Sequence, residues 1–330
     1  MKVAIFSTKA YEPAYLDKAN LADGHQLTYF NTSLNSSTID LATGYTAVSV
    51  LLSDKIDKEA IEKLSHAGVK LIDLRSAGYD NVDIEAARLH QINVMRVPAY
   101  SPQAIAEHAT ALILTLNRKT HKAYNRVREN NFSVDNLMGF NLFGKTVGVI
   151  GTGNIGSAFC NIMLGFGCKV IAYDILEDIS IKEKNIRYVS FDDLMIQSDI
   201  ISIHCPLNTA TKYLLNANSF AKMKRGMMLI NTSRGAIIHT ADAIQALKSG
   251  QLGYLGIDVY EGEQNLFFKD LSQSIIQDDL IERLMSFNNV LITPHQAFFT
   301  KEAVEQIAQI TIKNFTDFEK GGPLENEVKK

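Results

Sequence analysis

The sequence predicts an α/β fold with parallel sheets, arranged in two domains. Short β-rich runs alternate with helical stretches along the chain, and this alternation is typical of parallel sheets whose connections are helices. The length of 330 residues exceeds what one core usually holds, since single cores stop growing near roughly 250 to 300 residues. Breaks at Pro98 and Pro294 interrupt the alternation. We therefore expect two domains, with the chain crossing between them twice.

The N-terminal part of the alternation predicts a flavodoxin-like α/β domain at residues 1–100. Val97 precedes Pro98, which favours extended backbone, and Ser101 with Pro102 makes a good N-cap and first helical turn. The first crossing is therefore expected here. A final helix is expected to pack back on this domain, so that residues 299–330 belong to it. The predicted strands are residues 2–7, 47–52, 70–74 and 93–97, and the predicted helices are residues 56–67, 84–90 and 301–320.

The second domain, residues 101–298, is predicted to be a Rossmann-type doubly wound parallel sheet. One helix is expected to run from residue 102 to about residue 130, which is long for a globular protein. Packing on the core and contact with a second subunit are equally good interpretations of it. The six predicted strands are residues 147–150, 169–173, 200–204, 227–231, 255–259 and 290–293.

The composition excludes several classes of protein. A net charge of -3 provides no broad basic surface for nucleic acid. The 3 cysteines have no C-x-x-C spacing, which argues against disulfides and a metal site and favours a reducing compartment. The apolar run at the N-terminus is too short for a signal peptide. No apolar run in the sequence approaches the roughly 20 residues of a membrane span. We expect a cytoplasmic protein with no nucleic-acid or membrane partner.

A glycine-rich loop follows the first predicted strand of the second domain. In the G-x-G-x-x-G spacing, Gly151 permits a tight turn, Gly153 admits a pyrophosphate, and Gly156 lets the next helix pack closely. Asp174 ends the following strand, where a carboxylate would accept hydrogen bonds from an adenosine ribose and repel a ribose phosphate. The segment therefore predicts an NAD site. The predicted cofactor residues here are Gly151, Gly153, Asn154, Ile155, Gly156 and Asp174.

Further polar residues follow the later strands of this domain. Ligands of an open α/β sheet bind beyond the carboxyl ends of its strands, so these residues are candidates for the same site. His108 and His204 also lie near junctions of predicted elements, and we interpret both as structural. The residues at or after the strand ends are Cys205, Pro206, Thr232, Ser233, Arg234, Asp258 and His295.

Arg234, His295 and a glutamate have the chemistry that hydride transfer to a 2-keto acid requires. The planar guanidinium of Arg234 matches a substrate carboxylate and can polarise its carbonyl. The imidazole of His295 can donate a proton to the substrate oxygen. A neighbouring carboxylate would orient the ring and favour its protonated form. Spacing alone does not choose between Glu261 and Glu263 for that task.

At these positions the chain resembles the D-isomer-specific 2-hydroxyacid dehydrogenase family, over essentially its whole length. The resemblance implies that Arg234, Glu263 and His295 are the catalytic residues, which selects Glu263 over Glu261. It also implies that Asp258 lies close to the nicotinamide end of the cofactor site. The most specific matching segments are the glycine loop and residues 230–235, 258–263 and 294–300.

The resemblance also identifies substrate residues in the N-terminal domain. Residues 74–81 resemble the family's substrate loop, in which backbone amides around Ala77 and Gly78 hold the substrate carboxylate. Tyr100 and Phe299 match aromatic positions that close over a small side chain. The family's organisation further implies a homodimer formed through the long helix, with a homotetramer as the open alternative.

Within the family the resemblance is closest to the members that act on D-lactate, which implies reversible reduction of pyruvate to D-lactate with NADH. Where some of these carry a polar residue near the end of the second strand, this chain has Leu51, Leu52 and Ser53. An apolar wall there would tolerate larger 2-keto acids such as phenylpyruvate, since a methylene changes discrimination by only about 1 to 3 kcal/mol. Hydroxypyruvate and glyoxylate are further alternatives. A non-catalytic NAD-sensing interaction protein is a remote one, because the intact catalytic residues count against it.

Overall fold

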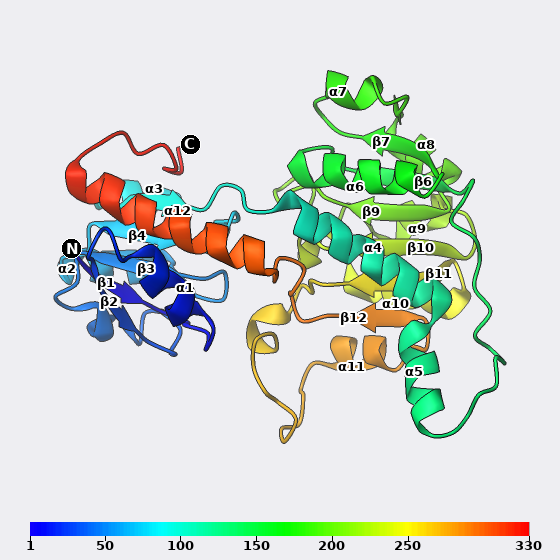
Figure 1. Cartoon of the computed structure of the whole chain (residues 1–330), viewed down its shortest axis with the longest axis horizontal. Coiled ribbons are helices and arrows are strands. Elements are labelled where there is room, and N and C mark those ends of the chain that lie inside the picture. Colours follow the sequence, from blue (N-terminus) through cyan, green and yellow to red (C-terminus); the bar gives the residue numbers. More distant parts are fainter. Residues whose placement is uncertain (330) are drawn as a thin grey trace. The chain divides into compact units, whose positions relative to one another are not determined.

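The computed structural model describes residues 1–329, apart from the side chain of Asn265. Lys330, the last residue of the predicted substrate domain, lies outside the described residues. The chain divides into two units by its internal contacts (Figure 1). Unit 1 comprises Met1–Ser101 and Phe299–Lys330, and unit 2 comprises Pro102–Phe298.

Unit 1 is built on a five-stranded sheet in the order β2-β1-β3-β4-β5, with every neighbouring pair parallel. This is the flavodoxin-like order that the sequence predicts. The second strand was not predicted, because its sequence QLTY is short and partly polar. The strands are β1 (Lys2–Ile5), β2 (Gln26–Tyr29), β3 (Ala47–Val50), β4 (Leu71–Leu74) and β5 (Asn93–Arg96).

Helices cover both faces of this sheet. Along β1, Ala4 packs in one apolar cluster with α2 (Lys58–His66) and α3 (Ile84–Leu89), together with the short helix η1 (Ile39–Ala42). Val3 and Ile5 point to the other face, where they pack with α1 (Glu12–Ala19) and α12 (Lys301–Lys320). The C-terminal helix therefore forms part of unit 1. Its N-cap is Thr300, whose side chain accepts a hydrogen bond from Ala303 N at 3.2 Å.

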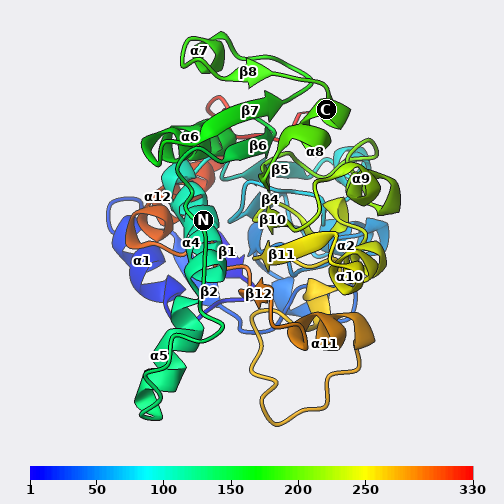
Figure 2. The same cartoon turned by 90° about the vertical axis from the view of Figure 1, so that its right-hand side faces the viewer.

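Unit 2 contains a seven-stranded sheet in the order β12-β11-β10-β9-β6-β7-β8, again with parallel pairs (Figure 2). The order reverses beside β6, which makes that strand end the switch point of a doubly wound sheet. The sequence analysis predicted six strands and missed β8, which has only two residues. The strands are β6 (Thr146–Ile150), β7 (Lys169–Tyr173), β8 (Arg187–Tyr188), β9 (Ile200–Ile203), β10 (Met227–Asn231), β11 (Leu252–Ile257) and β12 (Val290–Ile292).

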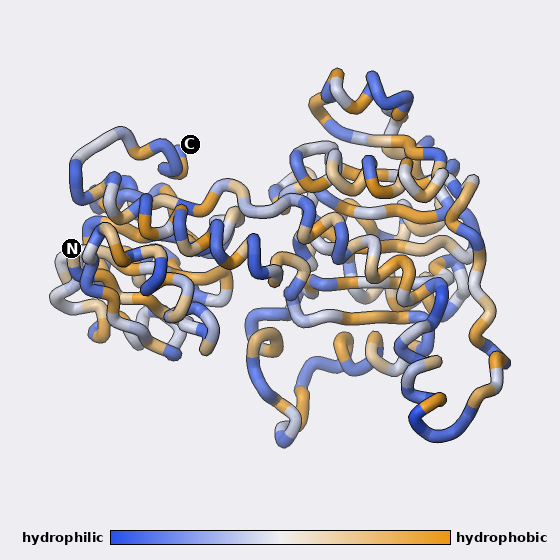
Figure 3. Tube along the Cα trace, in the orientation of Figure 1, coloured by the Kyte–Doolittle hydropathy of each residue, from blue (hydrophilic) through white to orange (hydrophobic). Residues whose placement is uncertain are grey.

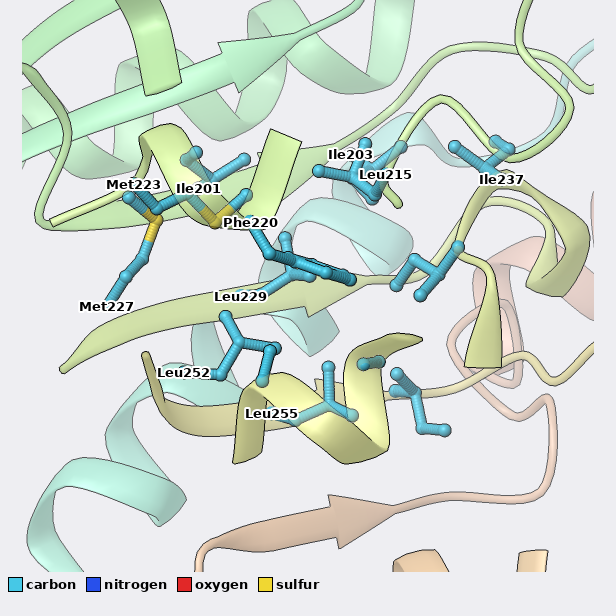
Figure 4. Packing of buried hydrophobic residues seen from close by; sticks show 14 of the residues in the cluster. Ile201, Ile203, Leu215, Phe220, Met223, Met227, Leu229, Ile237, Leu252 and Leu255 are labelled. Carbon is cyan, nitrogen blue, oxygen red and sulfur yellow. The ribbon is translucent and has the colours of Figure 1, made fainter. Parts of the chain in front are cut away.

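Two apolar layers enclose this sheet. One layer lies under α4 (Pro102–Arg118), α6 (Asn154–Gly165) and α7 (Ile179–Lys182), and it includes the fully buried Val147 and Val149. The other layer is packed mainly by leucine, isoleucine and methionine side chains (Figure 4). Hydrophobic residues are correspondingly concentrated in the strands (Figure 3). The helices of the second layer are α8 (Phe191–Gln197), α9 (Ala217–Lys222), α10 (Thr240–Ser249) and α11 (Asp279–Met285).

The long helix predicted for residues 102–130 is two helices. The backbone leaves helical geometry at Lys119, which has φ +50°, and α5 (Thr120–Arg128) begins after it. Nothing in the local sequence signals this break, since it contains neither glycine nor proline. The first helix packs on the core, whereas α5 has no buried residue. The prediction of one continuous helix was therefore wrong.

Candidate active site

The glycine loop turns from β6 into α6 in a shape that only glycine permits at two positions. Gly151 has φ +90°, and a Cβ there would lie 2.7 Å from the backbone nitrogen of Cys205. A Cβ on Gly156 would lie 1.9 Å from the carbonyl oxygen of Gly151, so a side chain would push the helix away from the loop. At Gly153 a Cβ would meet nothing within 4 Å. The open side of the loop is therefore at the glycine that was predicted to admit a pyrophosphate.

The first turn of α6 faces the same opening. Gly153 is the N-cap residue, and no side chain caps the helix there. The exposed Asn154 and the half-buried Ile155 begin the helix. Uncapped amides at a helix N-terminus bind anions through their N–H groups and the helix dipole. The loop and the helix start thus fit a phosphate-bearing group.

Asp174 follows β7 and is bound to the glycine loop. Its Oδ2 accepts hydrogen bonds from the backbone nitrogen of Thr152 at 2.6 Å and from the Thr152 hydroxyl at 3.1 Å. That hydroxyl also lies 2.7 Å from the Tyr188 hydroxyl. A carboxylate has about four acceptor positions, so Asp174 keeps capacity for a further donor. Asp174 was among the predicted residues, whereas Thr152 and Tyr188 were not. Tyr188 lies in β8, which was not predicted, and Thr152 occupies a variable position of the glycine-loop pattern.

The ends of β9 and β10 add polar groups beside the loop. Cys205 and Pro206 follow β9, and the Ser233 hydroxyl donates a hydrogen bond to the Cys205 carbonyl oxygen. The Thr232 hydroxyl is buried and has no hydrogen-bond partner within residues 1–329. A buried hydroxyl without a partner in the chain is available to bind a group outside it. Burial raises the pKa of the Cys205 thiol to about 11, so this thiol is neutral at pH 7.

Glu263 and His295 form a direct pair in unit 2. Glu263 Oε1 lies 2.9 Å from His295 Nδ1, and the two side chains are 21% and 15% exposed. The other carboxylate oxygen of Glu263 accepts a hydrogen bond from the backbone nitrogen of Tyr260 at 2.9 Å. Glu261, the alternative that spacing left open, instead accepts a hydrogen bond from the Tyr213 hydroxyl at 2.9 Å. The structure thus places Glu263, and not Glu261, beside the histidine.

Asp258 organises the turn that carries His295. It is fully buried, and it accepts hydrogen bonds from the Thr293 hydroxyl at 2.5 Å and from the backbone nitrogens of Gln296 and Ala297 at 2.9 Å and 2.8 Å. His295 itself has φ +56°, a left-handed conformation that such a turn has to hold in place.

His108 reaches the same turn from α4. Its Nε2 lies 3.0 Å from the Thr293 hydroxyl and 3.4 Å from Asp258 Oδ1. The second histidine interpreted as structural, His204, lies elsewhere, at the end of β9, and its Nε2 is 2.9 Å from the Ser202 hydroxyl. His108 therefore contacts the residues that hold the His295 turn.

Arg234 lies after β10, at the same edge of the sheet. A guanidinium nitrogen donates a hydrogen bond to the Ser233 carbonyl oxygen at 2.9 Å, and Asn231 Nδ2 donates to the Arg234 carbonyl oxygen at 2.9 Å. Gly235 allows close approach, because a Cβ there would lie 2.0 Å from the carbonyl carbon of Tyr260. Since β10, β11 and β12 are adjacent and parallel, the arginine, the glutamate and the histidine follow three neighbouring strand ends.

In unit 1, the segment after β4 presents two unpaired amides. The backbone N–H groups of Ala77 and Gly78 have no acceptor within the described part of the chain. The carbonyl oxygens of the same residues are held, by Arg96 NH1 at 2.6 Å and by the Ser76 hydroxyl at 2.9 Å. The loop thus has a fixed shape with two donors available, which suits binding of a carboxylate.

The aromatic residues predicted for substrate binding also lie in unit 1. Phe299 is 53% exposed, and its ring centroid lies 4.6 Å from that of Tyr11. Tyr100 is half-buried. Sequence reasoning missed Tyr11, because it is far from Phe299 along the chain and matches no motif. Its neighbour Glu12 forms a buried ion pair with Arg75 at 2.8 Å, which ties α1 to the segment after β4.

Within residues 1–329, no group of three or more histidine, cysteine, aspartate or glutamate side chains is placed to hold a metal ion. No helix in the same range is long and apolar enough to cross a membrane.

The residues present fit a dinucleotide cofactor. Gly153 leaves open space in the loop, the start of α6 is uncapped, and the Thr232 hydroxyl is buried without a partner in the described residues. A doubly wound sheet with this loop at its switch point, and a carboxylate-bound histidine at the same edge, defines the class of dinucleotide-binding dehydrogenases.

Comparison with known proteins identifies the family. Residues 110–297 match the family described as D-isomer specific 2-hydroxyacid dehydrogenase, NAD binding domain. The chain is 48% identical over 328 residues to a 2-hydroxyacid dehydrogenase homolog of Haemophilus influenzae, with 99% of each chain covered. It is 46% identical to the D-lactate dehydrogenase of Escherichia coli, covering 99% of this chain and 100% of that one. The chain belongs to the D-isomer specific 2-hydroxyacid dehydrogenase family.

Solved structures agree with this assignment. The apo-structure of D-lactate dehydrogenase from Escherichia coli superposes with a TM-score of 0.90 at 44% identity, with both chains fully covered. A structure described as the pyruvate reductase of Chlamydomonas reinhardtii has a TM-score of 0.92 at 43% identity, covering 99% of this chain and 98% of that one. The NAD-complexed family member from Lactobacillus delbrueckii has a TM-score of 0.81 at 30% identity, with both chains fully covered.

Proposed function

We propose that this chain is an NAD-dependent D-lactate dehydrogenase, which reduces pyruvate to D-lactate with NADH in a reversible reaction. The observation that carries the proposal is the 2.9 Å pair of Glu263 and His295 on the sheet edge that also bears the glycine loop. The names of the Escherichia coli and Chlamydomonas reinhardtii relatives support the substrate.

His295 is the proposed proton donor to the substrate oxygen. Its Nδ1 is bound by Glu263, so a proton on Nδ1 is shared with a carboxylate and the ring is held in one orientation. The opposite nitrogen, Nε2, is then the atom that donates to the oxygen of the 2-keto group. Bound NADH supplies the hydride that adds to the carbonyl carbon. In the reverse direction Nε2 accepts the proton of the hydroxyl group.

Arg234 is proposed to bind the substrate carboxylate and to polarise the carbonyl. Its backbone is fixed on both sides, by Asn231 and by the close approach of Gly235 to Tyr260. In unit 1, Ala77 and Gly78 are proposed to bind a substrate carboxylate through their unpaired backbone amides. Tyr100 and Phe299 are proposed to enclose the substrate methyl group.

The preference for NAD over NADP is also part of the proposal. Asp174 is held by Thr152 and by the backbone nitrogen of Leu176, and the acceptor capacity that remains on its carboxylate suits a ribose hydroxyl but repels a phosphate. The exposed Ile175 follows it, whereas Tyr173 packs against Phe191 with ring centroids 5.5 Å apart. An added cation is therefore best placed at residue 175.

The double variant Asp174→Ala with Ile175→Arg tests this preference. We expect the ratio of the Kd values for NADPH and NADH, measured by fluorescence quenching, to fall by about tenfold or more, because one salt bridge to phosphate replaces one repulsion. Ile179→Arg, which adds a cation at another exposed position of the same segment, is the matched control and should leave the ratio unchanged. An unchanged ratio in the double variant would refute the role of Asp174.

We further propose a cytoplasmic homodimer. The three cysteines are unpaired, in keeping with a reducing compartment. The helix α5 has no buried residue, and exposed apolar side chains gather on it and on the segment that follows. A homotetramer is the alternative that light scattering of the purified protein would distinguish. The exposed side chains are Tyr124, Val127, Phe132, Val134, Met138 and Phe143.

The principal alternative is a related enzyme for larger 2-keto acids. Leu51 and Leu52 follow β3 and are half-buried, so an apolar wall is present near the end of that strand. NADH oxidation with pyruvate, phenylpyruvate, hydroxypyruvate and glyoxylate decides between them. Pyruvate turned over with the highest kcat/KM supports the proposal. A higher kcat/KM for phenylpyruvate, hydroxypyruvate or glyoxylate contradicts it. NADH binding without turnover of any of the four would indicate a non-catalytic NAD-sensing protein.

A further inference from the structure

Phe268 lies against the histidine of the proposed active site. Its ring centroid is 5.9 Å from that of His295, and the two ring planes are tilted by 33°. Aromatic rings at such separations attract each other in offset arrangements. Phe268 is 41% exposed, so it is not simply a core residue. Neither the motifs of the sequence nor the family resemblance singled it out.

The chain that leads to Phe268 is fastened to Glu263. The carbonyl oxygen of Glu263 accepts hydrogen bonds from the backbone nitrogens of Leu266 at 3.0 Å and Phe267 at 2.8 Å. The side chains of Leu266 and Phe267 pack against the apolar cluster of unit 2. Glu263 thus binds His295 through its carboxylate. Through its backbone it also fixes the segment that brings the Phe268 ring against His295.

The backbone of Phe268 is strained. Its φ of +62° lies in the left-handed region, which a bulky L-residue rarely adopts. Strained residues cluster at functional sites, because the surrounding structure has to hold them there. A glycine would adopt this conformation freely. The conformation therefore disfavours phenylalanine, whereas the contact with His295 favours it.

The ring contact supplies a restraint that Glu263 alone does not. One hydrogen bond at Nδ1 fixes that end of the imidazole but leaves the ring free to swing about the line joining the two atoms. A second ring packed against the imidazole blocks this swing, and it also covers part of the pair from water. Proton donation from the opposite nitrogen depends on that orientation, since small displacements of a reacting group reduce the rate strongly.

We propose that Phe268 is a positioning residue that holds the imidazole of His295 for proton transfer. The proposal rests on the proposed function, because it assigns Phe268 a role in the same reaction. Removing a positioning residue lowers the rate of the chemical step without a matching loss of stability. Removing a merely structural residue would lower both together.

Four variants test the proposal in the full-length protein. Phe268→Gly removes the ring and relieves the backbone strain, Phe268→Ala removes the ring alone, and Phe268→Tyr keeps the ring. Ile275→Ala is the matched control, because Ile275 belongs to the same loop and is 86% exposed. The readouts are kcat for pyruvate reduction, the Kd of NADH and the temperature of unfolding.

We expect Phe268→Gly and Phe268→Ala to lower kcat by about tenfold, while the Kd of NADH stays within twofold of the wild type. Phe268→Gly should unfold at the temperature of the wild type or above it, because strain relief offsets the lost contact. Phe268→Tyr and Ile275→Ala should keep the wild-type kcat. A kcat within twofold of the wild type in Phe268→Gly would overturn the proposal. So would a loss of kcat that Ile275→Ala shares.

A readout without turnover separates this proposal from the proposed function. In protein labelled with ¹⁵N-histidine, the Nδ1 proton of His295 should give a slowly exchanging NMR signal, assigned by its absence in His295→Gln. We expect Phe268→Gly to exchange this proton at least tenfold faster and Ile275→Ala to leave it unchanged. Failure of the wild type to reduce pyruvate would refute the proposed function alone. Unchanged exchange in Phe268→Gly would refute the role of Phe268.

Discussion

At the scale of single residues, Glu263 is central to the proposed mechanism because its carboxylate binds both His295 and the backbone of Tyr260. Its carboxylate binds His295 Nδ1 at 2.9 Å and Tyr260 N at 2.9 Å, so both oxygens are occupied and the side chain has one orientation. The histidine beside it is only 15% exposed. The carboxylate therefore lies as a fixed charge partner beside the ring that is proposed to donate the proton.

Glu263→Gln tests this assignment. Glutamine keeps the size of the side chain and can still accept a hydrogen bond from the N–H group at Nδ1, but it carries no negative charge. We expect kcat for pyruvate to fall by about 100-fold, which is within the range for a lost acid or base partner. The Kd of NADH, measured by fluorescence, should stay unchanged. Wild-type kcat in this variant would show that the charge of Glu263 is not used.

At the scale of elements, the candidate site lies at a set of strand ends. The backbone geometry there depends on particular residues in the adjoining turns. The helix α6 starts against the Gly151 carbonyl oxygen because residue 156 has no side chain. The turn after β12 keeps a left-handed His295 because Asp258 accepts two of its backbone amides. Local features of this kind can be tested by measurements that do not require turnover.

Gly156→Ala should damage the cofactor site more than the fold. The added Cβ would lie 1.9 Å from a backbone oxygen, so the helix has to move away from the loop. Overpacking of this kind costs about 1 to 3 kcal/mol. We expect a rise of at least tenfold in the Kd of NADH and a lower unfolding temperature. Gly165→Ala in the same helix, where a Cβ meets nothing within 4 Å, is the control and should neither raise the Kd of NADH nor lower the unfolding temperature.

The burial of His204 predicts that the free energy of unfolding depends on pH. This histidine follows β9, its ring packs at 5.0 Å from that of Phe159, and burial lowers the pKa of His204 to about 3. An unfolded histidine titrates near 6.5, so between about pH 6.5 and pH 3 the unfolded chain binds a proton that the folded chain does not. The wild type should therefore lose up to about 1.4 kcal/mol of unfolding free energy per pH unit as the pH falls through this window.

Urea denaturation of the wild type and of His204→Gln between pH 7 and pH 4 measures this effect. The variant lacks the titrating ring, so its free energy of unfolding should fall less steeply with decreasing pH. The difference between the two proteins should narrow or reverse toward pH 4. Parallel pH profiles would mean that folding does not lower the pKa of His204.

At the scale of the whole molecule, the alternation of strands and helices was sufficient to predict two parallel sheets. The strand order of each sheet has the form expected for its fold class. What the alternation could not predict has a physical reason in each case. The strands β2 and β8 are short and partly polar, so they have no hydrophobic pattern, and the break at Lys119 has no glycine or proline to mark it.

The candidate site was predictable to a similar degree. Arg234 and His295 could be found because they follow apolar strands, where ligands bind. The choice of Glu263 needed the family resemblance, since two glutamates stand two residues apart and only the folded turn shows which one meets the histidine. Phe268 could not be found, because its proposed role depends on a ring contact and a backbone conformation that no motif encodes.

His295 is proposed to donate the proton in an NADH-dependent reduction of pyruvate to D-lactate. A single-turnover experiment with the wild type and His295→Ala, followed by NADH absorbance and by chiral analysis of the product, tests this role. We expect the wild type to form one D-lactate per NADH oxidised. In His295→Ala we expect the reaction to be slower by about 1,000-fold or more, with the same Kd for NADH. A wild type that binds NADH without forming D-lactate, or a variant that reacts at the wild-type rate, would contradict this proposal.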